Sequence, residues 1–390
     1  MGKHLYIILF FLPFLVSAQT EEKMLLLDHD IRIEATEAVN DMYNFKFDKA
    51  EKEFLKLKTK YPEHPIAYYL MGLSCWWKMM PYPNESEYIK KVENIFLAYM
   101  DTSITLAEKM YKANPKNPEA SFFLCASHGL KGNYYGESGK YIKSAFSTKE
   151  VFNYFKNLSE NNELSPEFLF GDAIFNYYAV WIREEYPQLK PILAFFPKGD
   201  KELGIKQLKE VSYNAFYTRT EAQYYLMKIY NDQNKGEEAL GVARYLATTF
   251  PDNAYFQRMY ARYAFTEGKW KEAEEVSTSI MYKYNIGMPG YEEVSARYAS
   301  FILGYINRRY YHNNEKAKEF YNKTIIFAAK TGNSKKDYNL IAISDLAKIA
   351  HEANDIASAR QYYKTLLDYA DRKSEKYKEA KQYLSENKKK

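Results

Sequence analysis

Two segments of equal length follow one another without a gap: TEAQYYLMKIYNDQNKGEEALGVARYLATTFPDN (Thr220–Asn253) and AYFQRMYARYAFTEGKWKEAEEVSTSIMYKYNIG (Ala254–Gly287). Ala239 and Ala273 hold the same place in the two segments, 34 positions apart. A period of this length is typical of a helix–turn–helix unit that stacks on its neighbours. The small alanine lets two helices approach closely, and Pro251 ends the first unit because proline cannot continue a helix.

The two segments resemble the tetratricopeptide repeat family. The family's small, aromatic and proline positions are matched by Leu226, Tyr230, Ala239, Leu246 and Pro251 in the first segment and by Tyr260, Gly268, Ala273 and Ile280 in the second. The resemblance extends, more loosely, from Ile31 to Lys373. It implies an all-α fold, a right-handed superhelical solenoid of seven or eight helix pairs. It also implies a concave face that binds a peptide or helix, and no catalytic activity.

Working outward from this stretch divides the chain into six parts. They are a signal peptide (1–18), a lead-in (19–30), enlarged and irregular repeats (31–219), two regular repeats (220–287), two further repeats (288–373), and a capping helix with a basic tail (374–390). We expect Ala50, Ala239, Ala273 and Ala359 to be buried, each between two helices. Within the irregular part, Asp48 is expected to cap a helix, and the three glycines of Lys131–Lys140 predict a loop.

The N-terminus predicts export. Lys3 and His4 precede the apolar run Leu5–Val16, and a small-residue cleavage site ends at Ala18, which together are typical of a secretory signal peptide. We expect a periplasmic or outer-membrane-associated protein with no transmembrane span in the mature chain. The high tyrosine content, 39 residues, resembles that of exported proteins of the Bacteroidota.

Composition and motifs argue against catalysis and nucleic-acid binding. The net charge of +5 is small and its basic residues are interspersed with acids, unlike the basic clusters of nucleic-acid binders. Gly139-Lys140 lacks the first glycine and the hydroxyl residue of a phosphate-binding loop, and His351-Glu352 lacks the second histidine of a zinc helix. We expect no enzyme, cofactor or metal. Cys75 and Cys125 either pair or, as we favour, remain as buried free thiols.

The repeat frame predicts a binding face. Positions two, five, nine and twelve of each first helix line the concave surface in the family, and here they predict partner-binding residues Tyr224, Lys228, Asn231, Tyr255, Arg258, Arg262, Phe265 and Lys348. We expect an exposed basic stripe interleaved with aromatic rings, which would hold an acidic segment of another exported or envelope protein. The alternative is a solvated face whose charges pair with acids of the next helix.

A second function also fits the sequence. The chain could be a structural subunit of a bacterial envelope assembly that docks through apolar insertion loops. The run Leu193–Pro197 lies in one such insertion, between Pro187 and Asp200, and it either docks on a partner or folds back between repeats.

Overall fold

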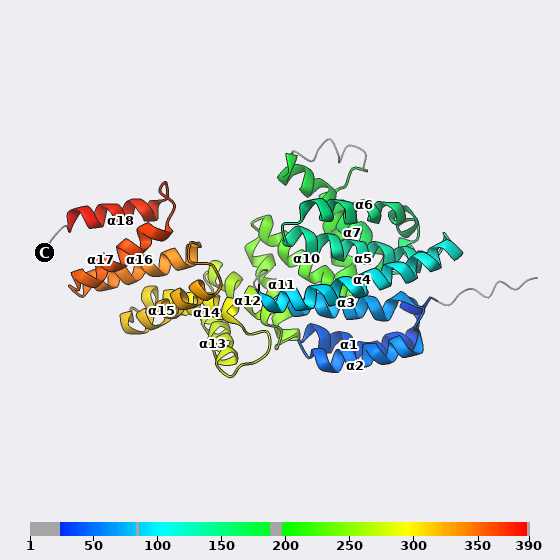
Figure 1. The fold of residues 1–390 in the computed structure, drawn as a ribbon, viewed down its shortest axis with the longest axis horizontal. Coiled ribbons are helices and arrows are strands. Elements are labelled where there is room, and N and C mark those ends of the chain that lie inside the picture. The colour runs from blue at the N-terminus through cyan, green and yellow to red at the C-terminus, as the bar shows by residue number, and fades with distance from the viewer. Residues whose placement is uncertain (1–23, 83–85, 188–196, 388–390) are drawn as a thin grey trace, which may run out of the picture.

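Helices make up almost the whole of the structure, and they are arranged in consecutive antiparallel pairs. The computed structural model describes residues 24–82, 86–187 and 197–387, and no strand occurs in these ranges. Figure 1 shows the early helices gathered in one block and the later ones, α13–α18, extending away from it towards the C-terminus. The predicted all-α solenoid of tetratricopeptide-like helix pairs is therefore confirmed.

The described residues form eight helix pairs and a final helix. The first four pairs are α1 (His29–Tyr43) with α2 (Phe47–Lys60), α3 (Pro65–Met79) with α4 (Glu87–Ala113), α5 (Pro118–Glu137) with α6 (Tyr141–Ser159), and α7 (Pro166–Glu185) with α9 (Lys201–Asn214). The next four are α10 (Arg219–Asp232) with α11 (Gly236–Thr249), α12 (Ala254–Thr266) with α13 (Trp270–Asn285), α14 (Glu293–Arg309) with α15 (Asn314–Lys330), and α16 (Asp337–Glu352) with α17 (Ile356–Tyr369). Helix α18 (Glu375–Glu386) covers the last pair.

The alanines at the recurring position have no exposed surface. Ala50, Ala239, Ala273 and Ala359 are all 0% accessible and lie in the first turn of the second helix of their pairs. A methyl group at this position leaves room for the partner helix, whereas a larger side chain would separate the two helices. The prediction made from the repeat frame is confirmed at all four positions.

The predicted loop at Lys131–Lys140 is wrong, because α5 continues to Glu137. A side chain at Gly132 would lie 3.3 Å from Thr148 Oγ1, and one at Gly136 would lie 3.3 Å from Ser144 Oγ. Both glycines therefore serve the close approach of α6 to α5. The third glycine, Gly139, makes the turn, with a φ of +71°.

The predicted cap at Asp48 is also wrong by two residues. Helix α2 begins at Phe47, with Lys46 preceding it, so Asp48 lies in the first turn. In the first turn its carboxylate interacts favourably with the positive N-terminal end of the helix dipole. The reversal before α2 is made by Phe45, which has a φ of 60°.

Several other expectations concern export and thiols. The expected signal peptide and Leu193–Phe196 lie outside the described residues. No helix in the described ranges is long and apolar enough to cross a membrane.

Cys75 and Cys125 are buried and not bonded to each other, which agrees with the favoured interpretation, that of two free thiols.

The first helix pairs fold back onto the middle of the chain. Trp77 of α3 packs edge-on against Tyr224 of α10 and Phe256 of α12, with ring centroids 5.6 and 5.1 Å apart. Asn253 Nδ2 donates to the carbonyl of Tyr43 at the end of α1, over 2.7 Å. The interior of this superhelical turn is thus filled by aromatic side chains, and its inner surface is part of the core.

A buried carboxyl group lies at the centre of this closure. Glu221, 6% exposed, accepts a hydrogen bond of 2.9 Å from Trp77 Nε1 and one of 3.2 Å from the Tyr43 hydroxyl. Burial raises the pKa of Glu221 to about 7, although both hydrogen bonds act in the opposite direction. Glu119 and Glu167, in the first turns of α5 and α7, are buried in the same way and accept from backbone amides of distant segments.

Replacing Ala273 by leucine should destabilise the fold, because the added methylene groups have no space at the crossing of α12 and α13. Overpacking of this kind costs roughly 1–3 kcal/mol. Urea unfolding followed by circular dichroism measures the difference. The exposed Thr278 on the same helix gives the control, since Thr278→Leu should change the unfolding free energy little; equal stability of both variants would contradict the predicted crossing.

The free energy of unfolding should decrease as pH rises through the range in which Glu221 titrates. Its folded pKa of about 7 lies above the value near 4.3 expected for an unfolded chain, so between these values the folded protein binds more protons. The resulting stabilisation is complete below the unfolded pKa and is lost as pH rises through the folded pKa; on the order of 2–3 kcal/mol of it is lost between pH 5 and pH 8. Glu221→Gln cannot titrate, so its unfolding free energy relative to the parent should improve by this amount between pH 5 and pH 8. Parallel pH profiles for the two proteins would refute this assignment.

Candidate partner-binding site

A hollow of about 310 Å³ opens between α10, α12 and α14. We call it the arginine pocket. Its lining residues are Lys228, Asn231, Asp232, Tyr255, Arg258, Met259, Arg262, Tyr263, Val294 and Tyr298. Five of them (Lys228, Asn231, Tyr255, Arg258 and Arg262) were predicted from the repeat frame. The pocket lies at the edge of the closed interior, because the preceding frame positions on α10, Glu221 and Tyr224, are buried beneath Trp77.

Arg258 is a buried cation without an acidic partner. Its side chain is 5% exposed, and its Nη1 donates to Ser295 Oγ over 3.2 Å. Its guanidinium carbon lies 5.1 Å from the centre of the Tyr255 ring. Burial lowers the pKa of Arg258 to about 10. The part of the chain that the structure describes places no carboxylate in an ion pair with it, so its charge is compensated only by dipoles and rings.

Two more arginines lie close to the ring of Tyr298. The guanidinium carbon of Arg262 lies 4.9 Å from the ring centre, and that of Arg297 lies 4.4 Å from it. Burial acts to raise the pKa of the Tyr298 hydroxyl, but the charges of Arg262, Arg297 and Arg258 outweigh it and hold this pKa below its ordinary value. Three guanidinium groups therefore gather at the α12–α14 side of the pocket.

Lys228, on the opposite side, has a counter-charge of its own. Its Nζ lies 3.4 Å from Glu137 Oε1 and 3.3 Å from the Tyr224 hydroxyl. Burial acts to lower the pKa of Lys228, but Glu137 and the neighbouring tyrosines outweigh it, so the pKa lies above the usual value. Lys228 therefore stays charged and paired, and the uncompensated charge of the pocket belongs to the arginines.

The exposed stripe that the sequence predicts is not what the structure shows. Tyr224 and Arg258 are buried, and Phe265 packs among Trp270, Phe301 and Tyr305. Lys348 lies on α16, away from the pocket lining, where its Nζ is 3.0 Å from Glu379 of α18. That last contact is the pairing with an acid of a following helix that the alternative interpretation expected. The concave positions are buried because the superhelix closes on itself, which a repeat frame does not encode.

The repeat frame did not predict the pocket residues that come from α14. Ser295, Arg297 and Tyr298 complete the positive side of the pocket. Their repeat follows the turn Met288–Gly290, which shifts it out of the strict period. The sequence feature that could have indicated these residues is Arg297-Tyr298, an arginine close to a tyrosine, as Arg258 is close to Tyr255 in the preceding helix pair.

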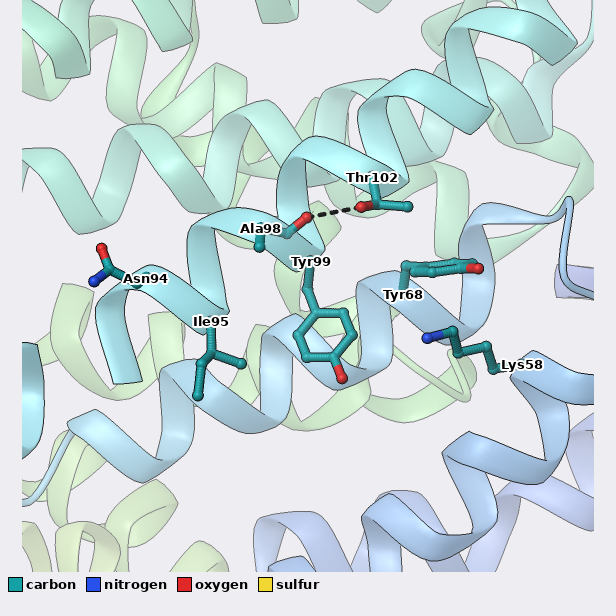
Figure 2. Close-up of a pocket in the computed structure, with 7 residues that line it drawn as sticks. All are labelled: Lys58, Tyr68, Asn94, Ile95, Ala98, Tyr99 and Thr102. Atoms are coloured by element: carbon teal, nitrogen blue, oxygen red, sulfur yellow. Dashed lines mark hydrogen bonds between the residues drawn. The ribbon is translucent and has the colours of Figure 1, made fainter. Parts of the chain in front are cut away.

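Figure 2 shows a second hollow, of about 370 Å³, lined by residues from α2, α3 and α4. Its Lys58 lies 5.0 Å from the centre of the Tyr68 ring. The Thr102 hydroxyl donates to the carbonyl of Ala98 within α4, over 2.9 Å. The remaining lining is Asn94, Ile95 and Tyr99. Lys58 is the one charged side chain in the described lining of this hollow, so the hollow offers less chemical selectivity than the arginine pocket.

Within 24–82, 86–187 and 197–387, no three His, Cys, Asp or Glu side chains gather as potential metal ligands.

No protein-family model and no curated protein matches the sequence. Among solved structures, the chain is similar to a human IFIT1 dimer with m7Gppp-AAAA, at 16% identity and a TM-score of 0.44, covering 83% of this chain and 67% of that one. It is also similar to yeast Tom70, at 12% identity and a TM-score of 0.37, covering 92% of this chain and 81% of that one. Similarity at these levels concerns the helical architecture alone.

Replacing Arg258 by methionine should leave the free energy of unfolding unchanged or raise it by up to about 2 kcal/mol. The reason is that a buried charge without a counter-charge gives way to an apolar side chain of similar length. Chemical denaturation measures this. Arg244→Met is the control, because Arg244 holds a paired carboxylate, Glu272, at 2.8 Å, and its loss should destabilise by less than about 1 kcal/mol at this exposed site. A large loss of stability in Arg258→Met would show that the arginine serves the fold.

Proposed function

We propose that the protein is a non-catalytic interaction scaffold whose arginine pocket binds an acidic segment of another protein. The observation that carries this proposal is the buried guanidinium of Arg258, which lines the pocket without an acidic partner among the described residues. Burying an unpaired charge is costly, and an anionic group that entered from outside would supply the missing charge. Arginine is suited to this role because its planar fork donates two parallel hydrogen bonds to an anion.

The shape of the site favours an extended segment over a helix. The buried side chains of Tyr43 and Trp77 from the first pairs and Tyr224 of α10 fill the described interior between them, where a groove for a helix 10–12 Å across would have to lie. A pocket of about 310 Å³ is at the small end for a ligand site and suits one or two side chains. The partner would present them from an extended chain that crosses α10, α12 and α14.

The proposed partner is another exported or envelope protein. This part of the proposal rests on the signal-like N-terminus, with its basic start, apolar run and small residues ending at Ala18. A chain delivered outside the cytoplasm meets its partners there.

The alternative, a structural subunit that docks by an apolar surface, is favoured by a different feature. Tyr141, Ile142 and Phe146 of α6 are 66–76% exposed and lie within two turns of one helix. An exposed apolar cluster is a common mark of an interface. It lies on the third helix pair, apart from the arginine pocket, so the two functions can be separated by mutation.

Binding of a fluorescent twelve-residue peptide rich in aspartate and glutamate tests the proposal by anisotropy. The whole chain should bind it and should not bind the matching peptide of asparagine and glutamine. The double variant Arg258→Met/Arg262→Met should weaken binding at least tenfold, since charge-assisted hydrogen bonds contribute about 1.5–3 kcal/mol each. Ile142→Ser/Phe146→Ser is the matched control and should bind as the parent does. If it loses binding while the arginine variant keeps it, the α6 surface is the site.

A further inference from the structure

The arginine pocket carries more positive charge than one carboxylate neutralises. Arg258 and Arg262 line it, and the guanidinium carbon of Arg297 lies 4.4 Å from the centre of the Tyr298 ring. Among described residues, Arg258 donates to Ser295 Oγ, and Arg262 approaches Met259 Sδ to 3.7 Å and donates to the Tyr338 hydroxyl. None of these contacts is with an acid.

Some donors of this cluster have no acceptor. Nε of Arg262 and Nε of Arg297 are buried and make no hydrogen bond within the described part of the chain. The acid in the lining is Asp232, which is exposed at the end of α10 and receives a bond from Asn231. Lys228 is already paired with Glu137. The three arginines therefore keep an excess of charge and of donors.

The walls of the pocket are aromatic and apolar. The rings of Tyr255, Tyr263 and Tyr298, with Met259 and Val294, form the rest of the lining. Arginines stacked on rings keep the edges of their guanidinium groups available for hydrogen bonds. A ligand that fits this pocket combines a compact, multiply charged head with a small organic body.

We propose that the arginine pocket binds a phosphomonoester, borne on a side chain of the partner's extended segment. This inference rests on the proposed function and specifies its ligand. A phosphomonoester carries about −1.5 to −2 charges at pH 7 and three strong acceptor oxygens. It thus matches the positive charge of Arg258 and Arg262 and the unsatisfied donor of Arg262, whereas a single carboxylate brings one charge. The ester's organic body lies against the tyrosines.

Isothermal titration of the whole chain with three small anions at constant ionic strength tests the head group. Phenyl phosphate, benzenesulfonate and benzoate share one ring and differ in charge and shape. At pH 7.5 phenyl phosphate should bind at least tenfold more tightly than either of the others. Its affinity should fall below about pH 6, where the phosphate takes up its second proton. Arg258→Met should weaken phenyl phosphate binding at least tenfold, and the exposed Arg372→Gln should leave it unchanged.

Peptides distinguish the source of the phosphate and separate this inference from the proposed function. A twelve-residue phosphotyrosine peptide should bind at least tenfold more tightly than phenyl phosphate and than the same peptide with glutamate. Equal affinity of the phosphopeptide and phenyl phosphate would overturn the partner segment in favour of a free small ester. If the glutamate peptide binds and phenyl phosphate does not, the phosphate specificity is wrong and the scaffold function stands. If neither peptide binds, both proposals fail.

Discussion

The carboxyl group of Glu221 connects the N-terminal helices to the middle of the solenoid. It accepts hydrogen bonds from Trp77 and Tyr43, residues far from it in sequence, and it is buried. Polar groups buried this deeply are stable only with partners, so they specify one arrangement of the surrounding helices. An open array, in which each repeat contacts only its neighbours, has no equivalent constraint. Here the superhelix is closed through its concave side.

Closure determines which part of the inner surface a ligand can reach. The N-terminal ends of α10 and α12 are covered by α3, through the contacts of Trp77 with Tyr224 and Phe256. The side chains further along these helices, Lys228, Arg258 and Arg262, remain at the edge, where α14 completes the pocket. The packing of α3 against α10 and α12 therefore leaves the small, positively charged arginine pocket in place of a long groove.

Within that pocket, aromatic rings take the place of carboxylates beside the arginines. Tyr255 lies against Arg258, and Arg262 and Arg297 both lie within 5 Å of the centre of the Tyr298 ring. Ring faces attract cations without neutralising them, so the field of the arginines persists, as the lowered pKa of Tyr298 indicates. The later helix pairs differ, since Arg308, Arg309 and Lys348 each pair with an acid.

The sequence by itself determined the helix pairs and their crossings, because a 34-residue period with alanine at Ala239 and Ala273 is a local pattern that one unit and its neighbour satisfy. It also indicated five residues of the pocket. It could not show that Glu221 and Tyr224 would be buried, that Gly132 and Gly136 belong inside a helix, or that Arg297 and Tyr298 join Arg258. Those outcomes depend on contacts between helices that the repeat frame does not relate, and only the closed tertiary structure brings these side chains together.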